Sequence, residues 1–554
     1  MKSTIICVAL SVFFFSCKKN NQPAPNIVSP FTFTLATIND STNSALLFYN
    51  INYNPVIRLS FSAPINTSDV AFEITLAGGG NVVSNNFSYV NNDSTIILQP
   101  SSPLRPLTNY ILTVSQGLKS AGDSLLKKNI YLTFITQIDS TDKFPQISDS
   151  ALLTLVEQQT FNYFWEFGHP VCGMARERTS SGDIVTTGGS GFGIMAMLVG
   201  VQRNFITREQ ALSRIDTIVN FLSNKATHYH GAFPHWINGS TGATIPFSTQ
   251  DDGGDIVETS YMMQGLLCAR QFFNSTTDAN EINLRAAINN LYNGVDWNWY
   301  RQNGQNVLYW NWSPDYGWAI NVRVGGWDEA LITYVLAASS NVDSSTIPKI
   351  VYDNGWAGNG GMKNGNSYYG IPLPLGPAFG GPLFFAHYSF LGINPHNLSD
   401  TYANYWQQDT AHAMINYLYC VSNPNKYNGY SNSCWGLTAS DIQNGYTASS
   451  PTNDVGVIAP TAAVSSLPYT PTQSMNAIRF FYYKLGNKIW SQYGFIDAFN
   501  LSSLWFDSDC LAIDQGPQIV MIENYRSGLL WNLFMSCPEV KRGMTNLGFQ
   551  GPDL

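Results

Sequence analysis

Four acidic residues lie within the short segment 251–258 of a 554-residue chain that holds only 37 acids. They are Asp251, Asp252, Asp255 and Glu258. The Gly-Gly pair at 253–254 favours a turn, because glycine is costly inside a helix. Apolar residues then recur at helical spacing, so Asp255 and Glu258 should face the same side of a helix. Converging carboxylates suit acid/base chemistry, such as the cleavage of a glycosidic bond.

The same spacing also has a purely structural interpretation. Asp-x-x-Glu before an apolar run is typical of a capping box, in which Asp255 caps the helix and Glu258 reaches back to a backbone N–H. Acids in a first turn also suit the helix dipole. Capping does not need Asp251 and Asp252, however. These extra acids favour a functional cluster, and Asp251, Asp255 and Glu258 are our catalytic candidates from this segment.

A second acidic locus follows at GGWDEA, residues 325–330, at the start of a helix predicted over 328–338. Here too the acids could simply suit the helix dipole. With a glycine pair and Trp327 before it, Glu329 could equally face a cavity. The two loci together would supply the two separated carboxylates that a glycosidase needs.

Five of the 14 tryptophans fall between positions 297 and 318. We expect Trp297 and Trp299 to belong to a core beside a helix, whereas Trp310, Trp312 and Trp318 lie in a loop where their ring faces could stack on sugars. The further candidates for substrate binding are polar or aromatic residues of other loops, namely Arg176, Phe192, His235, Trp236, Trp327, His387 and Tyr388.

The composition excludes several classes of function. A net charge of −9 with only 28 basic residues argues against nucleic acid as a partner. Charged residues make up 12% and aromatic residues 14%, a balance that suits neutral polar ligands. The eight cysteines form no metal-ligand pattern, and Cys420 and Cys434 are more readily explained as free thiols than as a pair. The sequence therefore predicts no cofactor and no metal.

The N-terminus resembles a bacterial lipoprotein signal. Residues 1–17 contain Lys2, an apolar run and a terminal Ser-Cys, so Cys17 would carry the lipid. This run is too short to span a membrane, and the anchor would be the protein's only membrane contact. Residues 18–29 form a polar linker that begins with two lysines. These favour the periplasmic face of the outer membrane over the cell surface.

Two domains are predicted after the linker. Residues 30–137 alternate short runs rich in Val, Ile, Thr and Phe with turns, which is typical of a bacterial Ig-like β-sandwich. Residues 138–149 form a second linker. From 150 to 554 the periodicity becomes helical, and the predicted helices include 191–201 and 518–533. Long loops rich in glycine and aromatic residues lie between the helices. The fold class is therefore mainly α, and long ordered loops of this kind usually carry function.

Several ordered motifs resemble the bacterial glucoamylase-like lipoproteins, and more closely the endo-β-1,2-glucanases of glycoside hydrolase family 144. They run from about residue 150 to 537 and include TGGSGFG, QDDGGDIVETSYMMQGLL, GGWDEALITYVLAA, GGPLFFAHYSFLGINP, WGLTASD, GVIAPTAA and AIDQGPQIVMIENYRSGLLW. The resemblance implies an (α/α)6 toroid around a central cleft. It also implies inverting, endo-acting hydrolysis of linear β-1,2-glucan to sophorooligosaccharides.

Carried over by motif, Asp251, Asp255, Glu258 and Glu329 would be the acids of the cleft. We assign Glu329 as the general acid, while Asp255 or Glu258 would activate or position the water; the sequence leaves this division of roles open. The alternatives are a hydrolase or transglycosylase acting on another glucan, and a non-catalytic glycan-binding lipoprotein. A binding protein would not need two acidic loci. We expect the protein to be a monomer.

Overall fold

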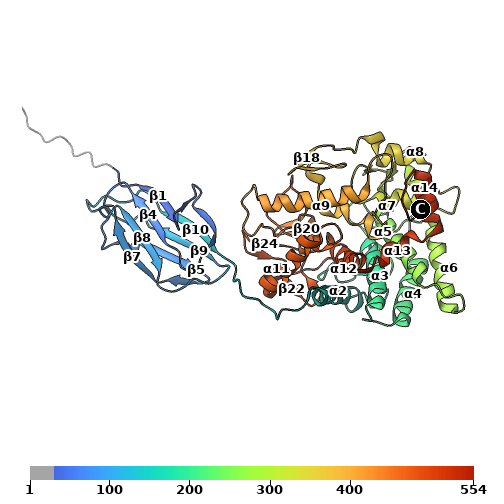
Figure 1. Cartoon of the computed structure of the whole chain (residues 1–554), viewed down its shortest axis with the longest axis horizontal. Coiled ribbons are helices and arrows are strands. Elements are labelled where there is room, and N and C mark those ends of the chain that lie inside the picture. The colour runs from blue at the N-terminus through green and yellow to red at the C-terminus, as the bar shows by residue number, and fades with distance from the viewer. Residues whose placement is uncertain (1–29) are drawn as a thin grey trace, which may run out of the picture. The chain divides into compact units, whose positions relative to one another are not determined.

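The computed structural model describes residues 30–554, and the chain divides after Gln137 into two compact units (Figure 1). The first unit consists mainly of strands and the second mainly of helices. The predicted lipoprotein signal with Cys17 and the linker 18–29 lie outside the described residues. Within the described residues, no helix is long and apolar enough to cross a membrane.

The first unit is a sandwich of two five-stranded sheets. One sheet has the order β2 (Ser41–Thr42), β1 (Phe33–Ile38), β4 (Ile57–Phe61), β8 (Thr95–Pro100) and β7 (Asn85–Val90). The other has the order β3 (Leu47–Ile51), β10 (Ile130–Thr136), β9 (Asn109–Val114), β5 (Ile74–Gly78) and β6 (Asn81–Val83), and the short helix α1 (Val70–Glu73) precedes β5. The parallel pairing of β3 with β10 closes one edge. The predicted all-β Ig-like sandwich is confirmed.

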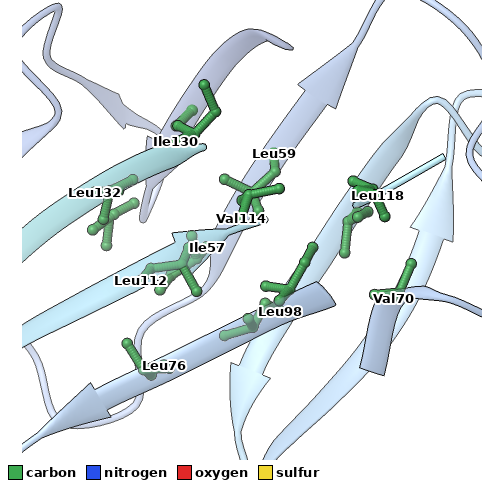
Figure 2. Packing of buried hydrophobic residues seen from close by; sticks show 14 of the residues in the cluster. Ile57, Leu59, Val70, Leu76, Leu98, Leu112, Val114, Leu118, Ile130 and Leu132 are labelled. Atoms are coloured by element: carbon green, nitrogen blue, oxygen red, sulfur yellow. The ribbon is translucent and has the colours of Figure 1, made fainter. Parts of the chain in front are cut away.

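The sandwich forms because buried and exposed side chains alternate along its strands. In β4, Ile57 and Leu59 are fully buried, whereas Arg58 between them is partly exposed. Side chains that alternate in this way place one face of each sheet on the core. Leu112 and Leu132 meet this face from the opposite sheet, and Figure 2 shows the aliphatic side chains of both sheets in one cluster.

The second unit is built mainly from pairs of helices. In each pair the first helix is partly exposed and the second is buried. The pairs are α2 (Asp149–Trp165) with α3 (Thr187–Gln202), α4 (Arg208–Asn224) with α5 (Ile256–Phe272), α6 (Ala279–Gly294) with α7 (Leu331–Ala338), α9 (Tyr405–Ser422) with α10 (Pro460–Ser465), and α11 (Pro471–Ile489) with α12 (Ala512–Ser527). Two further helices, α13 (Leu529–Met535) and α14 (Pro538–Leu547), end the chain.

The buried helices form an inner ring. α3 packs against α5 and α12, α5 also packs against α7, and α12 also packs against α10. The sixth outer position holds the short α8 (Lys349–Val351) and η2 (Tyr352–Trp356), and the sixth inner position holds the 3-10 turns η5 (Leu383–Ala386) and η6 (Ser389–Leu391). η6 contacts α7 and α12, and His387 bonds Ser466 at the end of α10 over 3.0 Å. The predicted (α/α)6 toroid is therefore confirmed, with 3-10 turns replacing one inner helix.

Glycine allows the closest contact in the ring. A Cβ on Gly191 of α3 would lie 2.1 Å from the carbonyl oxygen of Tyr261, and one on Gly265 of α5 would lie 2.1 Å from that of Gly191. Any larger residue would force the two helices apart. The small residues at the start of α3 are thus required by packing, and the helix begins at Thr187 rather than at the predicted Gly191.

Two other local predictions were wrong. The predicted helix 518–533 is two helices, because Gly528 adopts a left-handed conformation (φ 71°) that ends α12 before α13 begins. The helix predicted over 328–338 begins only at Leu331, which leaves Asp328 and Glu329 in the turn before it. Within the described residues the six cysteines are buried and free, including Cys420 and Cys434.

Candidate active site

One cavity of 410 Å³ lies among the loops at the ends of the inner helices. Three carboxylates line it, those of Glu177, Glu258 and Glu329, together with His235. Rings supply much of the remaining wall, namely Trp236, Phe247, Tyr261, Trp310, Phe384, Tyr388 and Tyr446. The cavity therefore combines apolar ring faces with a small set of ionisable groups, as carbohydrate-cleaving sites require.

Glu258 lies in the first turn of α5 and points at the start of α3. Its Oε2 accepts hydrogen bonds from the backbone N–H of Gly188 at 2.7 Å and from the Thr186 hydroxyl at 3.4 Å. A Cβ on Gly188 would lie 2.5 Å from this oxygen, so glycine is needed for the contact. Burial raises the pKa of Glu258, and the neighbouring His235 opposes that rise.

Asp255 is fully buried behind two residues of the cavity wall, His235 and Trp310. Its Oδ1 caps α5 by accepting the N–H groups of Val257 (3.0 Å) and Glu258 (2.9 Å). Its Oδ2 lies 3.0 Å from His235 Nδ1 and accepts the indole N–H of Trp310 at 3.3 Å. Asp255 thus serves as helix cap and also positions two residues of the cavity wall.

His235 is the ionisable group closest to these acids. Desolvation alone would lower its pKa, but the carboxylates of Glu258 and Asp255 outweigh that effect and raise it to about 9. The imidazole is therefore a cation at neutral pH, and it favours the charged form of Glu258 in return.

Glu329 enters the cavity from a different element, the turn just before α7. Its backbone carbonyl accepts hydrogen bonds from the hydroxyls of Tyr261 and Ser389, which fix the turn. Burial, followed by the charge of the adjacent Asp328, raises the pKa of Glu329 well above that of an ordinary glutamate. A raised pKa favours the protonated carboxyl, which is the form that a general acid needs.

Asp251 lies in the turn that presents Phe247. The backbone N–H of Asp251 bonds the carbonyl of Ser248 at 3.0 Å, and its own carbonyl accepts the N–H of Phe247 at 2.9 Å. Burial and the charge of Asp255 raise the pKa of Asp251 to about 6. Asp251 therefore lies close enough to Asp255 to feel its charge, although the cavity lining in this turn comes from Phe247.

Five of the predicted ligand-binding residues pack behind the cavity. Phe192 lies against the rings of Tyr261 and Tyr388, which do line it. The others contact different neighbours: Arg176 lies over the Phe167 ring, Trp312 against His230 and Trp299, Trp327 against Phe390, Tyr405 and His412, and His387 against Ser466 and Tyr469. The structure thus places His235, Trp236, Trp310 and Tyr388 in the wall and these five outside it.

From the segment Arg176-Glu177-Arg178 the sequence analysis chose Arg176, whereas the structure places the other two residues in the wall. Glu177 and Arg178 directly follow Arg176, and Arg178 donates to Glu177 and, at 2.7 Å, to Asp441. Successive side chains of an extended segment point to opposite sides, so Glu177 was detectable as the alternative to Arg176. Tyr446 comes from the hairpin of β20 (Ala439–Ile442) and β21 (Gly445–Ala448), and its position in the sequence carries no spacing that would point to a site.

Comparisons with known proteins agree with this architecture. Residues 321–538 match the Glycoamylase family model, described as “Putative glucoamylase”, and residues 32–136 match a bacterial Ig-like domain. An endo-β-1,2-glucanase from Chitinophaga pinensis is 50% identical, with a TM-score of 0.72 over 74% of this chain and all of that one. A β-1,2-glucanase structure from Parabacteroides distasonis is 36% identical over 93% of this chain and 72% of that one, with a TM-score of 0.70.

A curated relative has a different named activity. An exo β-1,2-glucooligosaccharide sophorohydrolase of Parabacteroides distasonis is 45% identical over 434 residues, which is 74% of this chain and 60% of that protein. The described fold, the acidic cavity and the full-length match to the Chitinophaga structure agree with one another. The chain therefore belongs to the glucoamylase-like family that contains the bacterial β-1,2-glucanases of the glycoside hydrolase family 144 type.

Proposed function

We propose that this protein is an endo-acting, inverting glycoside hydrolase that cleaves linear β-1,2-glucan to sophorooligosaccharides. The observation that carries the proposal is the placement of Glu258 and Glu329, from two different helix starts, in one cavity walled by aromatic rings. The full-length similarity to an enzyme named as an endo-β-1,2-glucanase supports the choice of substrate and of internal cleavage.

Glu329 is the general acid in this proposal. Burial and the charge of Asp328 raise its pKa, which favours the protonated form that can donate to the leaving oxygen. The half-buried turn before α7 keeps this carboxyl at the cavity surface.

Glu258 positions the attacking water. Both oxygens of Asp255 are already engaged by backbone N–H groups, His235 and Trp310, which leaves Asp255 a positioning role. Glu258, by contrast, lines the cavity, and the cationic His235 beside it favours its charged, proton-accepting form. In this proposal the sequence-level choice between Asp255 and Glu258 falls on Glu258.

One other mode of action has direct support. The sophorohydrolase is an exo-acting relative at 45% identity, so release of disaccharide from chain ends is the second candidate. Hydrolysis or transglycosylation of another glucan and simple glycan binding are the remaining alternatives; the paired carboxylates argue against a protein that only binds.

The test uses residues 18–554 with β-1,2-, β-1,3-, β-1,4- and α-1,4-glucans, and reads reducing ends, product sizes and the anomer first formed. Mixed short oligosaccharides released from β-1,2-glucan alone, as the inverted anomer, are expected. Release of only disaccharide would replace endo with exo action, and activity on another polymer would overturn the substrate. Absence of activity on every glucan would favour the alternative that the protein only binds glycans.

The location is a further part of the proposal. Lipid attachment at Cys17 would hold the enzyme at the periplasmic face of the outer membrane, as a monomer. Metabolic labelling with a palmitate analogue should mark the full chain and spare Cys17→Ala, and protease should reach the protein only after the outer membrane is opened. Labelling of the variant, or digestion in intact cells, would contradict the anchor or its orientation.

A further inference from the structure

Three aspartates from distant parts of the sequence meet on the far side of Arg178 from Glu177. They are Asp441 on β20, Asp497 between β23 (Gly494–Phe495) and β24 (Phe499–Asn500), and Asp507 directly after β25 (Trp505–Phe506). One carboxylate oxygen of each lies within 4.8 Å of the other two. This cluster is separate from Glu258 and Glu329, so the proposed catalytic chemistry does not account for it.

Backbone hydrogen bonds hold the cluster together. The N–H of Asp497 donates to the carbonyl of Asp509 at 2.9 Å, and that of Asp507 to the carbonyl of Ala498 at 3.0 Å. The N–H of Asp441 donates to Asp497 Oδ2 at 2.7 Å. The three carboxylates are therefore fixed by the fold before any ligand arrives.

Two oxygens of the cluster have unused hydrogen-bonding capacity. Asp497 is fully buried, and no N–H or O–H group of the described residues donates to its Oδ1, although the carboxyl of Asp514 lies within hydrogen-bonding reach of Asp497. Asp507 accepts the N–H groups of Ser508 and Asp509 with Oδ1, while its buried Oδ2 likewise has no partner within the described chain. Unpaired buried carboxylate oxygens are costly, and a cation would satisfy them.

The local charge is strongly unbalanced. Arg178 is the cation that contacts the cluster, through Asp441 Oδ2, whereas the fourth acid Asp514 repels Asp497 and adds to the negative charge. A divalent cation would offset these like charges.

The donor atoms indicate which cation fits. Carboxylate oxygens without a histidine or thiol select a hard ion such as Ca²⁺ or Mg²⁺. Mg²⁺ is usually held by one or two carboxylates and several waters, whereas Ca²⁺ accepts more protein oxygens in a less regular geometry. Three converging carboxylates therefore favour Ca²⁺. A second cavity of 420 Å³, lined by Asp441 and Asp507, offers an entry path and room for water ligands.

We propose that Asp441, Asp497 and Asp507 bind one Ca²⁺ ion in preference to Mg²⁺. The ion braces the hairpin of β20 and β21 against the loops around β23 to β25. Tyr446 on that hairpin and Arg178, held by Asp441, both line the active cavity. The site would therefore stabilise one wall of the cavity without contacting Glu258 or Glu329, and its existence does not depend on which glucan is cleaved.

The experiment measures metal binding directly. The protein comprising residues 18–554 is treated with EDTA, exchanged into metal-free buffer and titrated with CaCl₂ or MgCl₂ by calorimetry. One Ca²⁺ per chain is expected, with Ca²⁺ also raising the Tm. Asp507→Asn keeps the Oδ1 contacts but removes a charged ligand, and it should weaken Ca²⁺ binding at least about tenfold. The exposed Asp343 provides the matched control Asp343→Asn, which should bind as the parent does.

Each outcome decides the proposal. Absence of Ca²⁺ binding, or equal binding by Asp507→Asn and the parent, would overturn it, and tighter binding of Mg²⁺ would overturn the preference for Ca²⁺. Asp497 is buried, so Asp497→Asn could unfold; Asp507 is only partly buried and keeps the test independent of that risk. Circular dichroism of each variant confirms that loss of binding is not loss of fold.

Discussion

Asp255 Oδ2 lies 3.0 Å from His235 Nδ1, while Oδ1 of the same carboxylate caps helix α5. One side chain therefore links the start of an inner helix to the charge state of the cavity. Asp255 caps the helix as the capping interpretation predicted, but Glu258 accepts the N–H of Gly188 instead of reaching back to the cap, so the predicted capping box is only half formed. The two oxygens of Asp255 perform different tasks, one structural and one at the cavity.

The two roles of Asp255, capping helix α5 and bonding His235, can be separated by mutation. Asp255→Ala removes both contacts, whereas Asp255→Ser keeps a capping oxygen and loses the bond to His235. We expect both variants to lose activity on β-1,2-glucan by more than about tenfold, since each releases residues of the catalytic cavity. Only Asp255→Ala should also lose the capping contribution, about 0.5–2 kcal/mol of the free energy of unfolding. Full activity of Asp255→Ser would contradict the positioning role.

The titration of His235 gives a second readout for Asp255. A raised histidine pKa contributes stability that is present below the unfolded value of 6.5 and is lost as the pH rises through about 9. Because Asp255 is one cause of the rise, the pKa of His235 should be lower in Asp255→Ser. NMR titration of the imidazole measures this directly, and an unchanged pKa would exclude the coupling.

Glu329→Gln should abolish the proton donor while preserving the shape of the side chain. We expect kcat to fall by about 10²–10⁴-fold on β-1,2-glucan, with the Tm and the affinity for oligosaccharide retained. The exposed Glu209 on α4 supplies the control Glu209→Gln, which should remain as active as the parent. Undiminished turnover by Glu329→Gln would remove this residue from the chemistry.

Asp328 should set the alkaline limit of the activity. The general acid must be protonated, so the rate falls as the pH rises through the pKa of Glu329. The charge of Asp328 raises that pKa; Asp328→Asn removes the charge and keeps an oxygen for the N–H of Ala330, which Asp328 binds at 2.8 Å. The alkaline limb of kcat/KM should therefore move to lower pH. A limb that stays in place or moves upward would contradict this assignment.

A single methyl group should disturb Glu258. In Gly188→Ala the new Cβ would lie 2.5 Å from Glu258 Oε2 and 2.7 Å from the Tyr261 ring, so the carboxylate must move. We expect kcat/KM to fall at least about tenfold, because displacements of about 1 Å are costly in catalysis. Gly294→Ala, at the end of α6 where a Cβ meets open space, is the matched control and should leave the rate unchanged.

The sandwich should unfold without affecting catalysis. Leu59→Ala removes a fully buried side chain from its core, which typically costs about 2–5 kcal/mol. Since the cavity belongs wholly to residues of the helical unit, calorimetry should show one transition lowered and the other unchanged, with the hydrolytic rate on soluble glucan preserved. Loss of activity in a folded Leu59→Ala protein would show that the sandwich contributes to turnover.

The sequence predicted those parts of the fold that follow a local period. Ile57 and Leu59 alternate with polar residues, and the outer helix α4 buries residues such as Ile215 and Leu222 at helical spacing. α3 is buried on nearly every side and has no such pattern, so its first turn was missed. The conversion of one inner helix into the 3-10 turns η5 and η6 likewise has no periodic signal.

Candidate site residues were predictable where a helix start positions them. Glu258 and Glu329 each stand beside a glycine-rich turn and a helix, and both line the cavity. Tyr446 and the aspartate cluster arise from contacts between distant loops, such as the bond from Asp441 N–H to Asp497 Oδ2. The spacing of residues along the sequence does not show such contacts between distant loops.

The buried cysteines of the helical unit can report where and how fast it unfolds locally. Burial raises the pKa of the Cys172 thiol to about 11 and that of Cys510 to about 12, so these thiols are protonated and shielded in the closed protein. A protein lacking residues 1–17 retains only the six cysteines of the helical unit. The rate at which an alkylating reagent modifies each cysteine would therefore measure the rate of local unfolding around it. Peptide mapping of the modified sites would show which helices separate first.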